Sequence, residues 1–425
     1  MATDSLNRTT TEEKLVWYGM IMTYPLFAVG GLYVTGSLLG WLIFAVATLR
    51  WYTNESAEQA YVPAIVWLWI VAGFVLLLAL LVAHANWDLG LAKTIKSTIG
   101  WAKGWALMPL FLLLGAITNL KPALLTRAAC IVSSHSLMFA ALSVGLYFIG
   151  APADLFVSPL QVVGGPGPDF FTVSWFGLNP ETGVGRWRFF APWAPAAGFM
   201  ACILLIFCAQ EKNVFWRNIG LLGSLVMCLL SQSRAGWVIF LMLIPLLFFI
   251  GKLQNPLALI IFGVALCGLF LVAELIYEWL MATYSDIKAA RPDSSRVRSA
   301  LARIALQRWE AEAPIWGHGI VERGPKIVEF MPIGTHHSWY GLLFVKGVVG
   351  FCALAIPLAI TASYLLLQSH KTEMLGAAFC MILVFVFYSF FENLEILAFI
   401  YWPALLWIGM ALNPLKSGEC DGKQP

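Results

Sequence analysis

The stretch that decides the fold is residues 62–84, which read VPAIVWLWIVAGFVLLLALLVAH and contain no Asp, Glu, Lys or Arg. A helix that crosses a bilayer needs about 20 mostly apolar residues, because the hydrocarbon core is about 30 Å thick. Residues 62–84 meet this requirement within one uninterrupted run. We therefore expect a transmembrane helix here.

The whole chain has the composition of a membrane protein. Of its 425 residues 60% are hydrophobic and 12% are charged, whereas a soluble domain has about 45–50% apolar and about 25% charged residues. The net charge of +3 is too small to indicate a nucleic-acid partner. We predict an all-α polytopic membrane protein that forms a single integral membrane domain over residues 1–425.

Eleven further apolar runs are long enough to be considered as membrane spans. They cover residues 13–30, 31–50, 98–118, 128–149, 191–209, 218–232, 235–251, 256–280, 339–367, 373–391 and 395–412. The predicted count of about 12 transmembrane helices depends on two divisions, at Gly30–Gly31 and at Ser231–Arg234. Without these divisions the count is ten or eleven.

The orientation follows from the basic residues in short loops, which are enriched on the cytoplasmic side. If both termini are cytoplasmic, including a tail at 413–425, the inner loops contain Arg50, Lys121, Arg127, Lys212, Arg217, Lys252 and Lys371. The opposite short loops around Gly30, Ser231–Arg234 and Glu392–Glu395 contain only Arg234. Two long segments, 150–190 and 281–338, then face outward.

The two outer segments differ in character. Residues 150–190 are rich in Gly and Pro, which predicts an irregular loop. The larger segment, 281–338, lies between the ninth and tenth helices. Within it, residues 294–312 have a helical apolar stripe, formed by Val297, Leu301, Ile304 and Ala305, and this pattern is typical of an amphipathic helix at the membrane interface.

Three arginine motifs belong to this outer side. Arg186 and Arg188 precede the sixth helix, Arg234 lies in the polar break Ser231–Arg234, and Arg296 lies near the start of the amphipathic helix. Arginine binds phosphate oxygens through two parallel hydrogen bonds, and a helix N-terminus adds free N–H groups. Each arginine also has a simpler interpretation: contact with lipid headgroups, a tight turn, or a solvated position beside the cap Asp293 or Ser294.

A pair of histidines, His336 and His337, ends the second outer segment. No third histidine or carboxylate stands at ligand spacing, so we expect no metal and no cofactor. A histidine has a pKa suited to a general base or a phosphate partner, although a pair of interfacial histidines is the alternative. Glu392, at the outer end of the eleventh helix, is a candidate for orienting an arginine or histidine.

All of these motifs emerge on one membrane face under one topology. Independent lipid-contacting residues would have no reason to do so. Arginines that surround a histidine on the outer side, without a metal, suit a reaction in which a diphosphate leaves and a hydroxyl attacks.

The same motifs resemble those of the bacterial O-antigen ligase/polymerase superfamily. The resemblance covers residues 180–412, with about twelve helices and one dominant outer loop. It is carried by the segment from Arg186 to Pro195, by Ser233-Arg234-Ala235-Gly236, by Ser295-Arg296 followed by Pro314 to Gly319, and by Thr335 to Tyr340 followed by Gly347 to Gly350. The family often has His-Asn where this chain has His336-His337. The sequence register favours His336 as the catalytic histidine, and His337 remains the alternative. The family usually has Pro-Asn in the sixth helix where this chain has Pro192-Trp193 and Ala194-Pro195, which leaves the choice between Arg186 and Arg188 open.

The resemblance implies a metal-independent, inverting glycosyltransferase. Such an enzyme moves O-antigen from undecaprenyl diphosphate to the lipid A core of lipopolysaccharide, on the periplasmic face of the bacterial inner membrane. The expected partners are the carrier-linked O-antigen, the lipid A core oligosaccharide and membrane lipids. The arginines would hold the diphosphate, and the histidine would be the base. The alternatives are an O-antigen polymerase, a protein-directed oligosaccharyltransferase and, in another class, a secondary anion transporter. A transporter would have inverted repeats and broken helices with polar midplane residues. The apolar runs contain few charges, of which Lys346 is the main one, so the transporter is the least favoured alternative.

Overall fold

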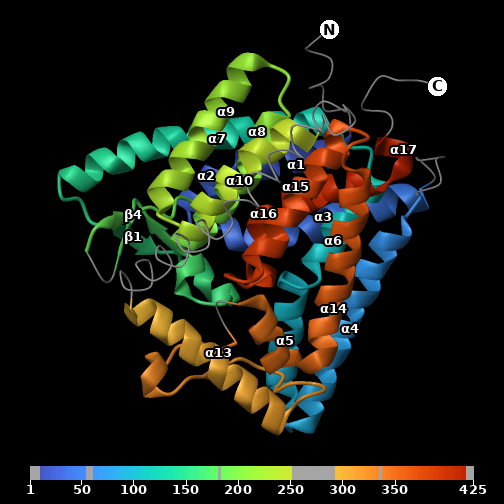
Figure 1. Ribbon diagram of the computed structural model, residues 1–425, viewed down its shortest axis with the longest axis vertical. Helices are drawn as coiled ribbons and strands as arrows, with labels where there is room; N and C mark the ends of the chain where they lie inside the picture. The colour runs from blue at the N-terminus through green and yellow to red at the C-terminus, as the bar shows by residue number, and fades with distance from the viewer. Residues whose placement is uncertain (1–9, 54–60, 180–182, 251–291, 335–336, 418–425) are drawn as a thin grey trace, which may run out of the picture.

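The chain folds into a bundle of helices, and the two segments predicted to face outward lie beside it (Figure 1). The computed structural model describes residues 10–53, 61–179, 183–250, 292–334 and 337–417, and for residues 292–295 it describes the backbone only. Seven described helical segments are long and apolar enough to cross a membrane, counting Leu91–Ile117 as one, and three apolar helices are shorter. The polytopic all-helical architecture is therefore confirmed, whereas the count of twelve is not.

The helices are numbered in chain order as in Figure 1. They are α1 (Thr11–Ile21), α2 (Thr23–Ala28), α3 (Leu32–Tyr52), α4 (Ala64–Asn86), α5 (Leu91–Lys103), α6 (Leu107–Ile117), α7 (Pro122–Phe148), α8 (Ala194–Ala209), α9 (Val214–Ser231), α10 (Arg234–Ile250), α13 (Pro292–Glu312), α14 (Ser338–Gln368), α15 (Glu373–Tyr388), α16 (Leu394–Leu412) and α17 (Pro414–Ser417). The run expected at 256–280 lies outside the described residues.

Three short antiparallel hairpins lie in the two segments predicted to face outward. The strands are β1 (Asp154–Val157) with β2 (Thr172–Ser174), β3 (Gly177–Leu178) with β4 (Gly185–Arg186), and β5 (Glu322–Arg323) with β6 (Pro332–Ile333). Single 3₁₀ turns occupy Pro159–Val163, Pro168–Phe170 and Lys326–Val328. The expected irregularity of residues 150–190 is thus observed.

Both uncertain helix divisions are confirmed. Gly30 has φ +65, a left-handed conformation that glycine adopts without strain, and it separates α2 from α3. α9 ends at Ser231 and α10 begins at Arg234, with Gln232 in the left-handed region at φ 49. A further break at Met22 divides the first expected run into α1 and α2.

Helix α16 lies at the centre of the bundle. It contacts α3, α6, α8 and α15, and nearly all of its residues are buried. Charged pairs join the helix ends that are predicted to be cytoplasmic: Arg50 lies 2.8 Å from Glu12, and Arg127 lies 3.0 Å from Glu211. In Figure 1 α17, the last described helix, lies toward the top, whereas α13 lies at the bottom.

Helix α14 is broken at Gly347, which has φ 64 inside an otherwise helical span. The segment Pro314–Gly319 fills the break. His318 and Gly319 donate backbone N–H groups to the carbonyls of Phe344 and Val345, and Val348 donates to Pro314. The backbone groups freed by the break are therefore satisfied by the protein itself.

The neighbouring Lys346 is also satisfied internally. Its side chain is buried, and its Nζ donates to the carbonyl of Leu76 at 3.2 Å. A broken helix with a midplane charge is one feature expected of a transporter. Here other groups of the protein form the hydrogen bonds of both the helix break and the Lys346 side chain, so both have a structural role.

The apolar stripe of α13 faces protein rather than lipid. Val297, Leu301 and Ala305 are at most 3% exposed, and they pack in one cluster with Val328 and Phe344. The expectation of an amphipathic helix is confirmed, with bounds close to the predicted 294–312. The apolar face is covered by the rest of residues 292–334 and by α14.

Candidate active site

The turn between α15 and α16 holds the start of α14. The Ser338 hydroxyl donates to the carbonyl of Glu392 at 2.7 Å and accepts from the backbone N–H of Leu394 at 3.0 Å. The backbone N–H of Ser338 donates to the carbonyl of Ser389 at 3.0 Å. These bonds fix the residue that precedes α14, His337, relative to the turn that carries Glu392.

Asn393 positions His337 directly. Its Oδ1 accepts from the backbone N–H of His337 at 3.2 Å, and its Nδ2 donates to the carbonyl of Gly334 at 3.2 Å. The same Nδ2 lies 3.4 Å from Oε1 of Glu395, and this contact orients the amide. Asn393 therefore holds the chain on both sides of the histidine pair.

The ring of His337 caps α14. Its Nδ1 accepts from the backbone N–H of Tyr340 at 3.4 Å, and the two rings stack with centroids 4.0 Å apart. Burial lowers the pKa of His337 to about 4, so the ring is neutral near pH 7. A neutral imidazole that accepts at Nδ1 carries its proton on Nε2. In this arrangement Nε2 is a hydrogen-bond donor.

Glu392 is a buried carboxyl group at the centre of the site, with 1% of its surface exposed. Its Oε2 accepts from Nε1 of Trp193 at 2.9 Å, while its Oε1 has no hydrogen-bond partner among the described residues. Burial raises the pKa of Glu392 to about 7, and the nearby charges of Arg298 and Arg186 oppose this rise. The carboxyl group therefore lies close to two arginines from different outer segments.

Arg186 is held against the turn that precedes α10. Its Nε donates to the carbonyl of Ser231 at 3.0 Å, and its Nη2 lies 3.5 Å from the carbonyl of Gln232. Gln232 in turn donates from Nε2 to the carbonyl of Gly185 at 2.9 Å. The structure thus joins the first arginine motif to the turn that carries Arg234.

The turn itself is shaped by small residues. The Ser233 hydroxyl accepts from the backbone N–H of Gly236 at 3.1 Å, which caps the start of α10. A Cβ atom at Gly236 would lie 3.1 Å from the Cα of Gly198 in α8, so the two helices approach closely there. The half-buried Arg234 is the first residue of α10, beside this contact.

Arg188 has a different environment from Arg186. Its Nη2 lies 2.8 Å from Oδ1 of Asp154, its Nη1 lies 3.9 Å from Asp169, and its Nε donates to the Ser174 hydroxyl. These bonds tie the start of α8 to the β1–β2 hairpin. Two carboxylates already neutralise Arg188, so the geometry favours Arg186 as the anion-binding arginine of this pair.

Arg296 and His336 complete the set of predicted residues. Arg296 is exposed on α13. His336 lies outside the described residues, as do the side chains of Asp293 and Ser294. Among the described residues no group of three His, Cys, Asp or Glu side chains could hold a metal ion.

Helix α13 is anchored to α14 by a charged chain. Nε2 of His318 lies 2.8 Å from Oε2 of Glu312, and the His318 ring stacks on Phe344 at 4.3 Å. Arg308 pairs with Glu312 at 2.7 Å and with Glu322 at 2.6 Å. These contacts fix the helix that carries Arg296 and Arg298.

Three contributors were not predicted from the sequence: Trp193, Arg298 and Asn393. Trp193 lies in the Pro192–Pro195 segment between Arg188 and the sixth helix, and its place there was its only signal in the sequence. Asn393 directly follows Glu392, so a polar pair at a helix end was its signal. Arg298 had no signal of its own among the basic residues of the outer loop.

The comparison with known families agrees with this picture. The model of a protein family described as O-antigen ligase matches residues 219–355, about a third of the chain. No curated protein sequence matches the chain significantly. The matched segment begins in α9, includes the Arg234 turn and α13, and ends in α14 beyond His337. The match confirms the resemblance seen in the sequence, and it is consistent with membership of the O-antigen ligase superfamily.

Proposed function

We propose that this protein is a metal-independent, inverting glycosyltransferase. It moves O-antigen polysaccharide from undecaprenyl diphosphate to the lipid A core, at the periplasmic face of the bacterial inner membrane. The family match supports a ligase-type or polymerase-type glycosyltransferase, and ligation is the reaction that we propose. The observation that carries the proposal is the buried Glu392, which lies beside Arg186 and Arg298 in the turn that fixes His337.

Arg186, Arg234 and Arg296 are the residues that we assign to the diphosphate. A leaving diphosphate gains negative charge as its bond to the sugar breaks, and fixed cations stabilise that charge. Arg186 is already oriented by the carbonyl groups of the α9–α10 turn. Arg188 keeps a structural role, because Asp154 and Asp169 compensate its charge.

His337 and Glu392 divide the work on the acceptor. An acceptor hydroxyl attacks the anomeric carbon, the bond from that carbon to the diphosphate oxygen breaks, and the configuration inverts. His337 donates from Nε2 and orients the reacting oxygen, because its Nδ1 is engaged by Tyr340. Glu392 takes the hydroxyl proton, since a pKa of about 7 suits a base at neutral pH. His336 is the alternative base.

The test is transfer in vitro from undecaprenyl-diphosphate-linked glycan to purified lipid A core. We expect transfer to persist in EDTA, to be lost in Arg186→Ala and to be retained in folded Arg188→Ala. Loss on chelation would overturn the metal-free mechanism. Equal loss in both folded variants would overturn the assignment of Arg186 over Arg188.

The polymerase is the second candidate, because the matched family also supports a polymerase-type enzyme. Both enzymes use the same donor, and they differ only in the acceptor. The lipopolysaccharide of a deletion strain separates them. Core without O-antigen, together with full-length carrier-linked glycan, indicates a ligase. Core that carries a single repeat indicates a polymerase.

A further inference from the structure

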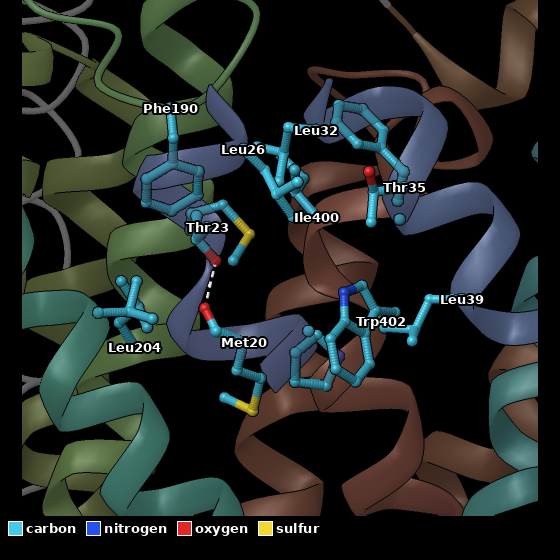
Figure 2. A pocket seen from close by; sticks show the side chains of 16 residues that line it. Met20, Thr23, Leu26, Leu32, Thr35, Leu39, Phe190, Leu204, Ile400 and Trp402 are labelled. Carbon is cyan, nitrogen blue, oxygen red and sulfur yellow. Dashed lines mark hydrogen bonds between the residues drawn. The ribbon is translucent and has the colours of Figure 1, made fainter. Parts of the chain in front are cut away.

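A crevice opens between α1, α2 and α3 on one side and α8 and α16 on the other (Figure 2). Its cavity volume is about 40 Å³, within about 500 Å³ of empty space that includes the open mouth. Figure 2 shows Met20, Leu26 and Leu39 around the opening, with Leu204 and Trp402 on the facing helices. We call this space the α1–α3 crevice.

The crevice suits hydrocarbon rather than a polar ligand. Its lining is apolar apart from the hydroxyls of Thr23 and Thr35 and the indole N–H of Trp402. The Thr23 hydroxyl already donates to the carbonyl of Met20 at 2.6 Å, as the dashed line in Figure 2 shows. Next to the crevice, Met22 and Leu38 are 41% and 62% exposed. The crevice therefore borders the surface that faces lipid in a membrane.

The crevice leads toward the candidate active site. A smaller pocket shares Leu32, Phe190 and Phe399 with it and extends to Asp169 and Pro192.

From this smaller pocket, aromatic contacts continue to the carboxyl group. The Phe170 ring lies 5.5 Å from that of Trp193, whose N–H donates to Glu392. Phe170 lines the smaller pocket, and only Trp193 separates it from Glu392, the carboxyl group that neighbours Arg186.

The direction of the crevice fits a chain that enters the membrane. Its α3 wall runs from Leu32, beside the outer turn at Gly30, to Leu39. Seven residues of α-helix span about 10 Å. The crevice therefore starts at the level of the outer loop and runs about 10 Å toward the middle of the bilayer.

The crevice is narrow. A Cβ atom at Gly36 would collide with the backbone of Phe399, and one at Gly19 would collide with the side chain of Leu39. Helices α1 and α3 are therefore already as close to their neighbours as glycine allows. A single linear chain fits such a space better than a lipid with several parallel acyl chains.

We propose that the α1–α3 crevice binds the polyisoprenoid chain of the diphosphate-linked donor. This inference rests on the proposed function, since it takes the diphosphate to lie at Arg186. The smaller pocket holds the isoprene units next to the diphosphate, and the α1–α3 crevice holds units farther along the chain. The crevice thereby places the donor lipid on the α1–α3 side and leaves the acceptor lipid to approach elsewhere.

The direct test is photocrosslinking in nanodiscs of phosphatidylglycerol and phosphatidylethanolamine. A diazirine amino acid of about the size of leucine replaces Leu39 in the crevice or, as the control, Leu78, which is 51% exposed on α4. Radiolabelled undecaprenyl diphosphate is the probe. We expect a crosslink at position 39 that excess unlabelled undecaprenyl diphosphate suppresses and added phosphatidylglycerol does not, and no suppressible crosslink at position 78. No probe adduct at position 39, equal suppression by the phospholipid, or equal labelling at both positions would overturn the proposal.

A second measurement uses chain length. Thr35→Phe narrows the crevice without touching the assigned diphosphate residues. We expect it to raise the KM of an undecaprenyl donor about tenfold and to leave that of a geranyl donor unchanged, since a short chain reaches only the smaller pocket. An equal effect on both donors, or none on either, would contradict the proposal. Loss of transfer on Arg186→Ala with no suppressible crosslink at position 39 would contradict this inference alone. A suppressible crosslink in a protein that transfers no glycan would instead contradict the proposed function.

Discussion

The protonation of Glu392 should set the pH dependence of transfer. Its pKa is raised from 4.5 to about 7 by burial. A base works only when deprotonated, so the rate should rise about tenfold per pH unit below pH 7 and level off above it. The pKa of His337 is about 4, so this ring contributes no limb above about pH 5. The midpoint of the profile therefore identifies the titrating group.

Trp193 provides the perturbation that moves this midpoint. Its N–H stabilises the charged carboxylate across 2.9 Å. A hydrogen bond to a charged group contributes about 1.5–3 kcal/mol, and one pKa unit corresponds to about 1.4 kcal/mol. Trp193→Phe should thus raise the midpoint by roughly one to two units, to above about pH 8.

The assay is single-turnover transfer at donor concentrations well below saturation, measured from about pH 5 to pH 9, so that the profile reports the pKa of the free enzyme. Glu392→Gln should lower the plateau about 100-fold or more and remove the limb. His337→Gln should lower the plateau and leave the midpoint near pH 7. A limb that survives in Glu392→Gln, or a midpoint that Trp193→Phe leaves unchanged, would refute the assignment and return the base role to His336.

Three further outcomes are expected. Arg186→Lys should reduce kcat by about 100-fold or more because lysine cannot reproduce the oriented fork, and steady-state kinetics showing full activity would contradict its role. Asn393→Ala should lower kcat by up to about 100-fold with little change in the donor KM, since it displaces His337 without touching the diphosphate; a change in KM alone would argue against this. Leu301→Ala should destabilise α13 by about 2–5 kcal/mol, which thermal unfolding in detergent can measure against an exposed control, Gln307→Ala, whose transition should not move.

The helices were predictable because burial in lipid imposes one strong requirement on sequence, a long apolar run. The divisions at Gly30 and Ser231 could be predicted for a related reason, since a glycine pair or a polar break interrupts such a run. The break in α14 could not be predicted from hydropathy. Gly347 is apolar by that measure, and the break is stabilised by a segment about 30 residues earlier in the chain.

The sequence indicated which residue types could form the candidate site, but not which of them contact one another. Arg186 and Arg188 are two positions apart, and nothing local distinguishes them. The distinction comes from Asp154 and Asp169, which the β1–β2 hairpin brings to Arg188. The partner of the α13 stripe could not be predicted either, because an apolar helical face looks alike whether lipid or Phe344 covers it. Partners distant in sequence decide both cases.

A carboxyl group beside the arginines of an anion site has a physical consequence for catalysis. In the absence of donor, Glu392 provides a counter-charge for Arg186 and Arg298, and these charges lower its pKa against the effect of burial. A bound diphosphate would take over as the counter-ion of the arginines and would place further negative charge nearby. Both changes raise the proton affinity of Glu392. Donor binding would thus strengthen the base at the stage when the acceptor hydroxyl has a proton to lose, which explains why a buried acid is retained among groups that must bind an anion.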